Sequence, residues 1–314
     1  MVLRQRNCLV VWWQRQFAET PAGSIILPIC LTSHSPVAAC CACRFQRWDH
    51  GTTSRAIAWG FRKRDYVRHV KGSILKRPLL GVSACFRRDD REPVHGVVDR
   101  YIIAAAKFVD ADVVIVPALA DAALARSLAG QLDGFLLTGT PSNVEPSRYG
   151  SAVGDGPFDP ARDETNLTLA EMMLNAEKPV FGICRGLQEL NVLYGGTLKT
   201  VDAPSHHAVE SEPLSALFAK QHRVTVCEDG VIANAFGGGT MTVNSVHFQG
   251  IDRLGGGLFV EAVADDGLIE SISAKAGRAR MLAVQWHPEW NAGSNSQSRW
   301  FFEELSRAIA EARA

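Results

Sequence analysis

One short stretch, residues 179–190, constrains the fold of this chain more than any other. It reads P-V-F-G-I-C-R-G-L-Q-E-L. Its first half is an apolar run suited to a buried strand, and its second half carries leucines at helical spacing. Cys184 stands where the strand gives way to the helix, with Gly182 and Gly186 on either side. The pattern predicts a sharp strand–turn–helix whose central residue is strained and whose neighbours must lack Cβ atoms.

The thiol of Cys184 is a candidate nucleophile because of this position. At such a turn a side chain projects above the edge of the sheet. It also lies at the N-terminus of the next helix, where the helix dipole favours a thiolate. The alternative is that Cys184 is a small buried hydrophobic residue, as most free cysteines are. A nucleophilic thiol also needs a base, which another part of the chain must supply.

The candidate base lies in residues 282–290, which read L-A-V-Q-W-H-P-E-W. His287 and Glu289 are two positions apart at the end of an apolar strand, so both side chains leave the same face. A cysteine nucleophile needs a histidine to take its proton, and the histidine needs an acceptor that fixes its tautomer. The pair could instead form a strand-end turn or two ligands of a metal. No second His/Glu cluster has recognisable ligand spacing, so we expect neither a metal nor a cofactor.

Taken together, the two stretches resemble the class I glutamine amidotransferase-like family, also known as peptidase family C26, with its Cys-His-Glu triad. The closer resemblance is to the gamma-glutamyl-gamma-aminobutyrate hydrolases. It extends over about residues 77–312 and rests on three further segments: Thr138–Pro146, Ile183–Asn191 and Val243–Gly250. The resemblance implies that Cys184, His287 and Glu289 are catalytic.

The expected fold is α/β, with a mostly parallel central sheet and helices on both faces. Strands and helices of ordinary length alternate from residue 79 to the turn at Cys184, which is typical of parallel sheets. The resemblance specifies a class I glutamine amidotransferase-like, flavodoxin-like sheet. Four later stretches are predicted as mostly antiparallel strands that form a small extension: 222–227, 240–244, 258–264 and 268–274. A closing helix is expected at 296–312, with Phe301, Phe302, Leu305 and Ile309 as its apolar stripe.

Further site residues follow mainly from the resemblance. It implies that the backbone N–H groups of Thr140 and Arg185 form an oxyanion hole, although the loop at 139–156 could also be a solvated surface loop. Gln188 lies one helical turn after Cys184, so its amide can face the same pocket. The resemblance makes it a contact of the glutamyl group. The wall of that pocket, or else a buried strand end, is expected from Asn244, Ser245, His247 and Gln249.

The implied reaction is hydrolysis of a γ-glutamyl amide through a cysteine thioester. The implied substrate is γ-glutamyl-GABA, which would yield glutamate and GABA in putrescine breakdown. Three alternatives stay open: a glutaminase subunit that delivers ammonia to a synthase, a γ-glutamyl peptidase, and a binding protein without activity. The glycine runs 237–239 and 255–257 lack the strand–helix context of a phosphate loop, so nucleotide binding is not expected there.

Residues 1–75 differ from the rest of the chain. They hold 11 of the 33 Lys and Arg residues, only three of the 33 Asp and Glu residues, and five of the eight cysteines. The resemblance does not include them. We therefore expect a disordered or spurious N-terminal extension, with a faint likeness to a transit peptide, followed by a hydrolase domain at 76–314. The apolar run at 8–13 is too short for a signal-peptide core or a membrane span.

The composition of residues 76–314 limits the partners and the compartment. This part holds 22 basic and 30 acidic residues, which argues against nucleic acid as a partner. Its three cysteines, Cys85, Cys184 and Cys227, do not form a disulfide framework, so a reducing, cytoplasmic location is expected. The expected partner is a small γ-glutamyl amine, and no association with a membrane is expected. Whether the chain forms a homodimer is left open. Neighbouring His206 and His207 point apart, which disfavours a shared metal.

Overall fold

The computed structural model describes residues 3–5, 8–10, 77–88, 92–201, 206–207, 213–277 and 279–314. Its internal contacts divide the chain into a unit Met1–His69 and a unit Val70–Ala314. In the first unit, β1 (Leu3–Gln5) pairs antiparallel with β2 (Cys8–Val10). The remaining residues up to 75 lie outside the described residues, so the predicted extension stays a prediction. Within the described ranges, no helix is long and apolar enough to cross a membrane.

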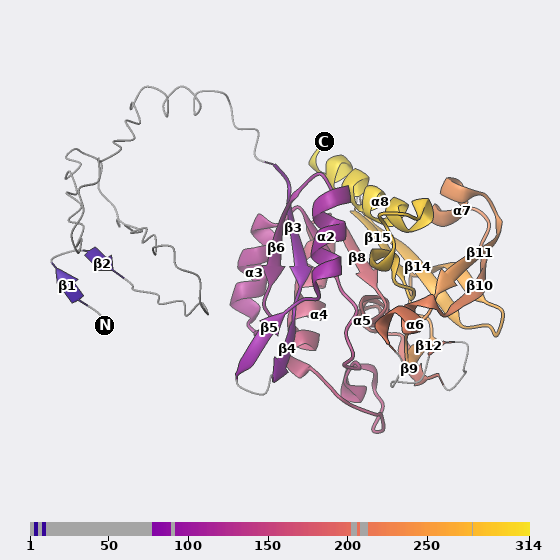
Figure 1. Ribbon diagram of the computed structural model, residues 1–314, viewed down its shortest axis with the longest axis horizontal. Helices are drawn as coiled ribbons and strands as arrows, with labels where there is room; N and C mark the ends of the chain where they lie inside the picture. The colour runs from indigo at the N-terminus through magenta and orange to yellow at the C-terminus, as the bar shows by residue number, and fades with distance from the viewer. Residues whose placement is uncertain are drawn as a thin grey trace, which may run out of the picture. The chain divides into compact units, whose positions relative to one another are not determined.

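The second unit is organised on a nine-stranded sheet with the order β11-β10-β13-β14-β15-β8-β7-β3-β6 (Figure 1). Five neighbouring strands at one end of this order run parallel to one another. Strands β7 and β8 are buried at every position, as expected where helices cover both faces. The predicted α/β fold with a parallel central sheet is confirmed. The parallel strands are β15 (Ala279–Val284), β8 (Val180–Ile183), β7 (Gly134–Leu137), β3 (Leu79–Ser83) and β6 (Asp112–Val116).

The predicted antiparallel extension continues the same sheet, because β14 pairs antiparallel with β15. Its strands are β10 (Gln221–Val226), β11 (Gly239–Asn244), β13 (Phe259–Ala264) and β14 (Ile269–Ala276). Two small antiparallel strand pairs of the second unit lie outside the nine-stranded sheet. Strand β4 (Cys85–Arg88) pairs with β5 (Pro93–Gly96), and β9 (Thr197–Thr200) pairs with β12 (Gln249–Arg253). Strand β5 is mostly exposed and has no apolar alternation by which its sequence could signal a strand.

Helices cover both faces of the parallel strands (Figure 1). On one face α2 (Asp99–Phe108) and α8 (Ser296–Arg313) pack over Leu136 and Phe181. On the other face α3 (Ala122–Gln131), α4 (Pro160–Asn175) and α5 (Arg185–Leu193) pack over the next residues along the same strands, Phe135 and Val180. This alternation follows from the two-residue period of a strand. The shorter helices are α6 (Leu214–Ala219), α7 (Val231–Phe236) and the 3-10 turns η1 (Pro146–Tyr149) and η2 (Pro288–Trp290).

Helix α8 closes the first face with its predicted apolar stripe, and Phe302 at the centre of that stripe is fully buried. We expect Phe302→Ala to lower the free energy of unfolding by about 3–5 kcal/mol, because the lost contacts leave a cavity in a rigid core. Chemical denaturation followed by circular dichroism measures this change. The neighbouring exposed residue provides the control, since Glu303→Ala should change stability by no more than about 0.5 kcal/mol. Equal losses in both variants would contradict the assigned packing of α8.

Candidate active site

The site is built on the turn between β8 and α5. Cys184 has φ 53° and ψ −105°, a positive φ that L-residues other than glycine rarely adopt. Hydrogen bonds on both sides hold this strained residue: its N–H donates to Val284 O at 2.7 Å, and its carbonyl accepts from Leu187 N at 2.9 Å. The strain persists because the surrounding structure fixes the backbone.

The two glycines around Cys184 are required by close approach of other backbone. A Cβ atom on Gly182 would lie 2.7 Å from the carbonyl carbon of Gly186. One on Gly186 would lie 2.5 Å from the carbonyl oxygen of Leu137 at the end of β7. Both distances are below any real Cβ contact, so larger residues would move the turn. The strand–turn–helix predicted from the G-x-C-x-G pattern is present for the predicted reason.

His287 and Glu289 lie just beyond the end of β15, and both are buried. The Nδ1 atom of His287 is 2.9 Å from Oε1 of Glu289 and 3.2 Å from the hydroxyl of Tyr101. The other ring nitrogen, Nε2, has no hydrogen-bond partner within the described part of the chain. A Cβ atom on Gly139 would lie 2.9 Å from Cε1 of His287 and 3.2 Å from Cβ of Cys184. The imidazole and the cysteine therefore flank the same small space.

The charges around His287 favour the imidazolium. Burial by itself lowers the pKa of His287, but the carboxylate of Glu289 and the neighbouring Cys184 outweigh it and raise the pKa to about 10. Burial would raise the pKa of Glu289, but His287 and Arg100 outweigh it and hold that pKa below its usual range. Nε of Arg100 donates to Oε1 of Glu289 at 3.0 Å. The three residues form a charged chain that sets the orientation of the ring.

Sequence reasoning missed Arg100 and Tyr101. Both come from α2, and Arg100 is 189 positions away from the carboxylate that it contacts. No local spacing could have paired them. Arg100 also lies over the ring of Phe218, with its guanidinium carbon 4.8 Å from the ring centroid. A partly exposed cation held on an aromatic face in this way gains roughly 0.5–1 kcal/mol.

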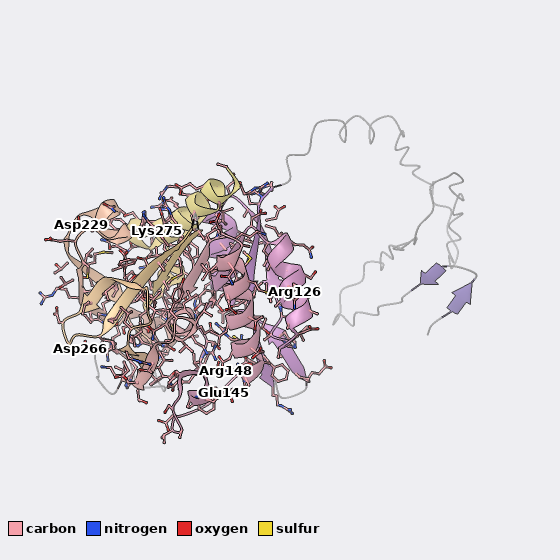
Figure 2. All side chains as sticks on the ribbon, turned by 180° about the vertical axis from the view of Figure 1, so that it is seen from behind. Arg126, Glu145, Arg148, Asp229, Asp266 and Lys275 are labelled. Carbon is pink, nitrogen blue, oxygen red and sulfur yellow. The ribbon has the colours of Figure 1, made fainter. Side chains whose placement is uncertain are left out.

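The two predicted oxyanion donors are the backbone N–H groups of Thr140 and Arg185. The side chain of Arg185 links the segments to which these two residues belong. The N–H of Arg185 is the first of α5, so helix geometry leaves it without an intrahelical acceptor. The guanidinium reaches back to the loop after Thr140, where it donates to Ser142 O at 2.8 Å and Asn143 O at 3.0 Å. Farther along this loop, Arg148 pairs with Glu164 at 2.7 Å and lies beside Glu145 (Figure 2). The oxyanion role stays a prediction.

A buried ion network lies beneath this loop. Glu189 on α5 is fully buried and pairs with two arginines, Arg185 on its own helix and Arg162 on α4. It also accepts from Asn166 Nδ2 at 3.0 and 3.1 Å. Arg162 in turn donates to the carbonyl of Thr138 at the end of β7. The network joins α4, α5 and the start of the loop, and the i,i+4 spacing of Arg185 and Glu189 was the one local signal for it.

Comparison with known proteins decides the family. The Peptidase C26 family model matches residues 78–289. A gamma-glutamyl-gamma-aminobutyrate hydrolase of Escherichia coli strain K12 is 35% identical over 237 residues, which cover 74% of this chain and 93% of that protein. This chain belongs to the peptidase C26 family. Membership makes it a hydrolase of carbon–nitrogen amide bonds in a class I glutamine amidotransferase-like family, as the sequence predicted.

Two further comparisons agree with this assignment of the C26 chain. Protein NtpR of Enterococcus hirae is 32% identical over 189 residues, or 57% of this chain and 76% of that protein. A solved structure of a GMP synthase subunit from Thermoplasma acidophilum superposes with a TM-score of 0.53 at 18% identity. It covers 76% of this chain and 96% of that one. At this identity the likeness concerns the fold alone, and it agrees with the predicted class I glutamine amidotransferase-like sheet.

In the C26 chain, the segment 244–249 runs past the thiol, because the carbonyl oxygen of Val246 is 4.0 Å from Sγ of Cys184. Asn244 holds the backbone of His287 on both sides: its Nδ2 donates to His287 O at 3.0 Å, and its Oδ1 accepts from His287 N at 2.7 Å. Ser245 donates to His206 O at 2.9 Å. The amide of Asn244 and the hydroxyl of Ser245 are therefore engaged with protein groups, and their predicted substrate contacts stay untested.

The remaining predicted wall residues divide into two groups. Gln188 donates through Nε2 to the backbone carbonyl of Gln249 at 2.7 Å, which ties α5 to the segment. Oε1 of Gln249 is buried without a hydrogen-bond partner in the described part of the chain. His247 instead directs Nε2 to Glu270, 3.4 Å away. The structure therefore groups Gln188 with Gln249, whose carbonyl Nδ1 of His247 also contacts at 3.0 Å, while Nε2 of His247 belongs to a cluster around Glu270.

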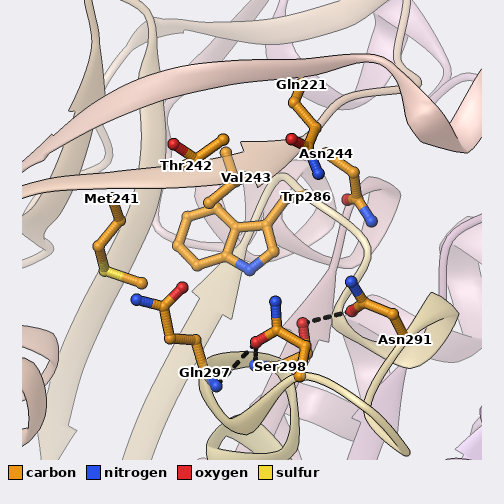
Figure 3. A pocket seen from close by; sticks show the side chains of 10 residues that line it. Gln221, Met241, Thr242, Val243, Asn244, Trp286, Asn291, Gln297 and Ser298 are labelled. Atoms are coloured by element: carbon orange, nitrogen blue, oxygen red, sulfur yellow. Dashed lines mark hydrogen bonds between the residues drawn. The ribbon is translucent and has the colours of Figure 1, made fainter.

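A small cavity lies between β11 and the start of α8, around Trp286 and next to Asn244 (Figure 3). Its volume is about 20 Å³, which is room for about one water molecule. Ser298 donates to Asn291 across its wall at 2.6 Å. The cavity is too small for an amide substrate and is therefore not the substrate pocket.

The network around Glu189 gives a stability prediction. Glu189→Gln removes the charge shared by two buried arginines, so we expect the free energy of unfolding to fall by about 3–5 kcal/mol. Chemical denaturation measures it. In the control, Asp265→Asn breaks the exposed pair with Arg223 and should leave the unfolding midpoint almost unchanged. A Glu189→Gln midpoint as high as the control's would show that the buried network contributes little.

The raised pKa of His287 gives a pH prediction. In a Cys184→Ala background no thiol shares the proton, and Glu289 still raises the pKa of the imidazole. Its contribution to stability is then full below the unfolded pKa of about 6.5 and is lost as the pH rises through the higher folded pKa. Unfolding curves at pH 5.5, 7.5 and 9.5 compare this background with the same protein carrying His287→Gln. The stability gap between them should shrink as the pH rises, and a gap that widens would refute the assignment.

Proposed function

We propose that the chain hydrolyses γ-glutamyl amide bonds with Cys184 as the nucleophile, His287 as the proton carrier and Glu289 as the group that orients the histidine. The observation that carries this proposal is the position of Cys184. It is held in a strained turn beside an imidazole whose far nitrogen is 2.9 Å from a buried carboxylate. A thiol, an imidazole and an acceptor in this order are the parts that acyl transfer by cysteine requires.

The reaction begins with the Cys184 proton on His287, as the raised pKa of the imidazole favours. The thiolate attacks the amide carbonyl, and the oxygen becomes an oxyanion that accepts from the N–H groups of Thr140 and Arg185. Each such donor contributes about 3–4 kcal/mol to the transition state. The C–N bond then breaks, and His287 gives its proton to the leaving amine. A thioester between the acyl group and Cys184 remains.

Water completes the cycle. His287, now neutral, takes a proton from a water molecule while that water attacks the thioester carbonyl. The C–S bond breaks, the acid leaves, and the proton returns to the Cys184–His287 pair. Glu289 and Arg100 keep Nδ1 oriented through both halves, so that Nε2 is the atom that exchanges protons.

For the substrate we propose γ-glutamyl-γ-aminobutyrate, with glutamate and GABA as products and putrescine degradation as the setting. The relatives from Escherichia coli carry that activity in their names and match 93% of their own length. Gln249 ends the segment that runs past the thiol, and its carbonyl accepts from Gln188. Its Oε1, which has no hydrogen-bond partner among the described residues, is an acceptor for the glutamyl ammonium group. We place the enzyme in the cytoplasm, because the catalytic thiol must stay reduced.

A panel of substrates tests the proposal. Purified protein is given γ-glutamyl-GABA, a γ-glutamyl peptide and glutamine, and released glutamate is measured. We expect turnover of γ-glutamyl-GABA, and a loss of at least about 10³-fold in Cys184→Ala with an unchanged circular dichroism spectrum. The control is Cys227→Ala, a free cysteine outside the site, which should keep full activity.

Other outcomes would redirect or end the proposal. Faster release from the peptide would make the chain a γ-glutamyl peptidase. Glutamine turnover that appears only with an added synthase would make it a glutaminase subunit. Undiminished turnover in the Cys184→Ala variant would exclude the thioester mechanism altogether.

A further inference from the structure

Behind the segment 244–249 lies a second group of ionisable side chains, which we call the histidine–glutamate cluster: His206, His222, His247 and Glu270. His222 lies on β10 and Glu270 on β14, the two neighbours of β13 in the sheet. The side chains of His206, His247 and Glu270 are almost fully buried, and that of His222 is 10% exposed. The hydrolase mechanism uses none of these side chains.

The three imidazoles converge on one carboxylate oxygen. Oε1 of Glu270 is 3.5 Å from Nδ1 of His206, 3.5 Å from Nε2 of His222 and 3.4 Å from Nε2 of His247. These separations are long for hydrogen bonds. In a tetrahedral zinc site with bonds of about 2.0–2.1 Å, the ligand atoms lie roughly 3.3–3.4 Å apart. The ligand atoms of His206, His222 and Glu270 all lie within 4.8 Å of one another. His206, His222 and Glu270 thus have nearly the spacing of a metal site, and Nε2 of His247 lies 3.4 Å from the same carboxylate oxygen.

For His206 and His247, the hydrogen bond on the side of the ring away from Glu270 determines which ring nitrogen carries the proton. Nδ1 of His247 is 3.0 Å from the backbone carbonyl of Gln249, which can only accept, so this nitrogen carries the proton. Nε2 of His206 is 2.7 Å from Oδ2 of Asp266, and it donates its proton to that carboxylate oxygen. Asp266 is labelled in Figure 2. In the neutral rings both inner nitrogens then direct lone pairs at Glu270. Histidines that bind metals are held from outside in this way by carbonyls and carboxylates.

The inner atoms have no other partners. Both oxygens of Glu270, both nitrogens of His222, Nδ1 of His206 and Nε2 of His247 lack hydrogen bonds in the described part of the chain. Buried polar atoms without partners are costly, and lone pairs that face a carboxylate repel it. Protons on the rings would draw the nitrogens to about 2.7–2.9 Å from the oxygen, which is shorter than the observed spacing. A cation at the centre would satisfy one nitrogen of each ring and an oxygen of Glu270 together, and the second nitrogen of His222 would face away from it.

We propose that His206, His222, His247 and Glu270 bind one divalent first-row transition ion of the Zn²⁺ type in a closed, four-coordinate site. Three imidazoles and one carboxylate suit such an ion better than Mg²⁺ or Ca²⁺, which prefer oxygen ligands. Four protein ligands leave no open position, so the ion is structural rather than catalytic. No metal was predicted from the sequence, because these residues are spread over 206–270 without a recognisable ligand spacing.

The site positions the wall beside the thiol. The carbonyl of His206 accepts from His247 N at 3.0 Å and from the hydroxyl of Ser245 at 2.9 Å. Between these two residues lies Val246, whose carbonyl is 4.0 Å from Sγ of Cys184. An ion bound by His206 and His247 therefore fixes the segment that runs past the nucleophile onto strands β10 and β14.

Metal binding itself is the test, and it does not depend on the proposed activity. Tag-free full-length protein carrying Cys184→Ala, which removes the reactive thiol as a competing ligand, is assayed for zinc by elemental analysis. It is then stripped with a chelator and titrated with Co²⁺. We expect one equivalent of metal and visible absorption typical of tetrahedral Co²⁺, displaced by Zn²⁺. His222→Ala and Glu270→Gln should each weaken binding by more than tenfold.

Two further variants sharpen the test. His207→Ala removes a histidine next to His206 whose ring contacts Phe248 instead, so its Co²⁺ affinity should stay unchanged. Asp266→Asn keeps all four ligands and alters only the outer partner of His206, so it should weaken binding about 10–100-fold even if the ligand variants fail to fold. The proposal would be overturned if the Cys184→Ala protein gave no tetrahedral Co²⁺ spectrum. It would also be overturned if His207→Ala and Asp266→Asn lost Co²⁺ affinity equally.

Discussion

A single buried carboxylate, that of Glu189, holds together the parts from which the candidate active site is built. It pairs with Arg162 and Arg185, which reach it from two different helices, and buried Asp163 supplies a second carboxylate to Arg185. Buried charges are costly unless each is paired and its remaining hydrogen-bonding positions are filled. Here both arginines also donate to backbone carbonyls of residues 138–143. The loop after β7 is thereby fixed to the first turn of α5, and the turn at Cys184 lies between them.

The sheet supplies the second half of the arrangement. Strands β8 and β15 are parallel neighbours, with Ile183 opposite Val284. Residues just beyond the ends of two such strands lie at the same edge of the sheet, so Cys184 and His287 meet although 103 positions separate them in the sequence. Arg100 and Tyr101 then approach from α2, and Asn244 from the end of β11. The chemistry of one histidine thus depends on four regions of the chain.

Local patterns were sufficient to predict most of the fold. The closing helix predicted at 296–312 is present as Ser296–Arg313, and the strand and helix predicted on either side of Cys184 are β8 and α5, because apolar spacing decides them. The short strand β12 and the helix α7 were not predicted, since neither has enough apolar residues to show a period. The motifs at Cys184 and His287 were sufficient to predict that these two residues lie close together, but not that Arg100 and Tyr101 join them. The contact of Arg100 with Glu289 and the contacts within the histidine–glutamate cluster join residues that are far apart in the sequence. A single sequence carries no spacing signal for such contacts.

The position of β15 also bears on how the protein is assembled. It is the last strand in the sequence, yet it lies between β14 and β8 in the middle of the sheet. While the chain leaves the ribosome, the parallel and antiparallel parts of the sheet can each form, but among the described residues they are paired with each other only through residues 279–284. The insertion of this strand closes the sheet and delivers the imidazole to the thiol in one event. A chain truncated before β15 would therefore hold Cys184 without the imidazole of His287 beside it.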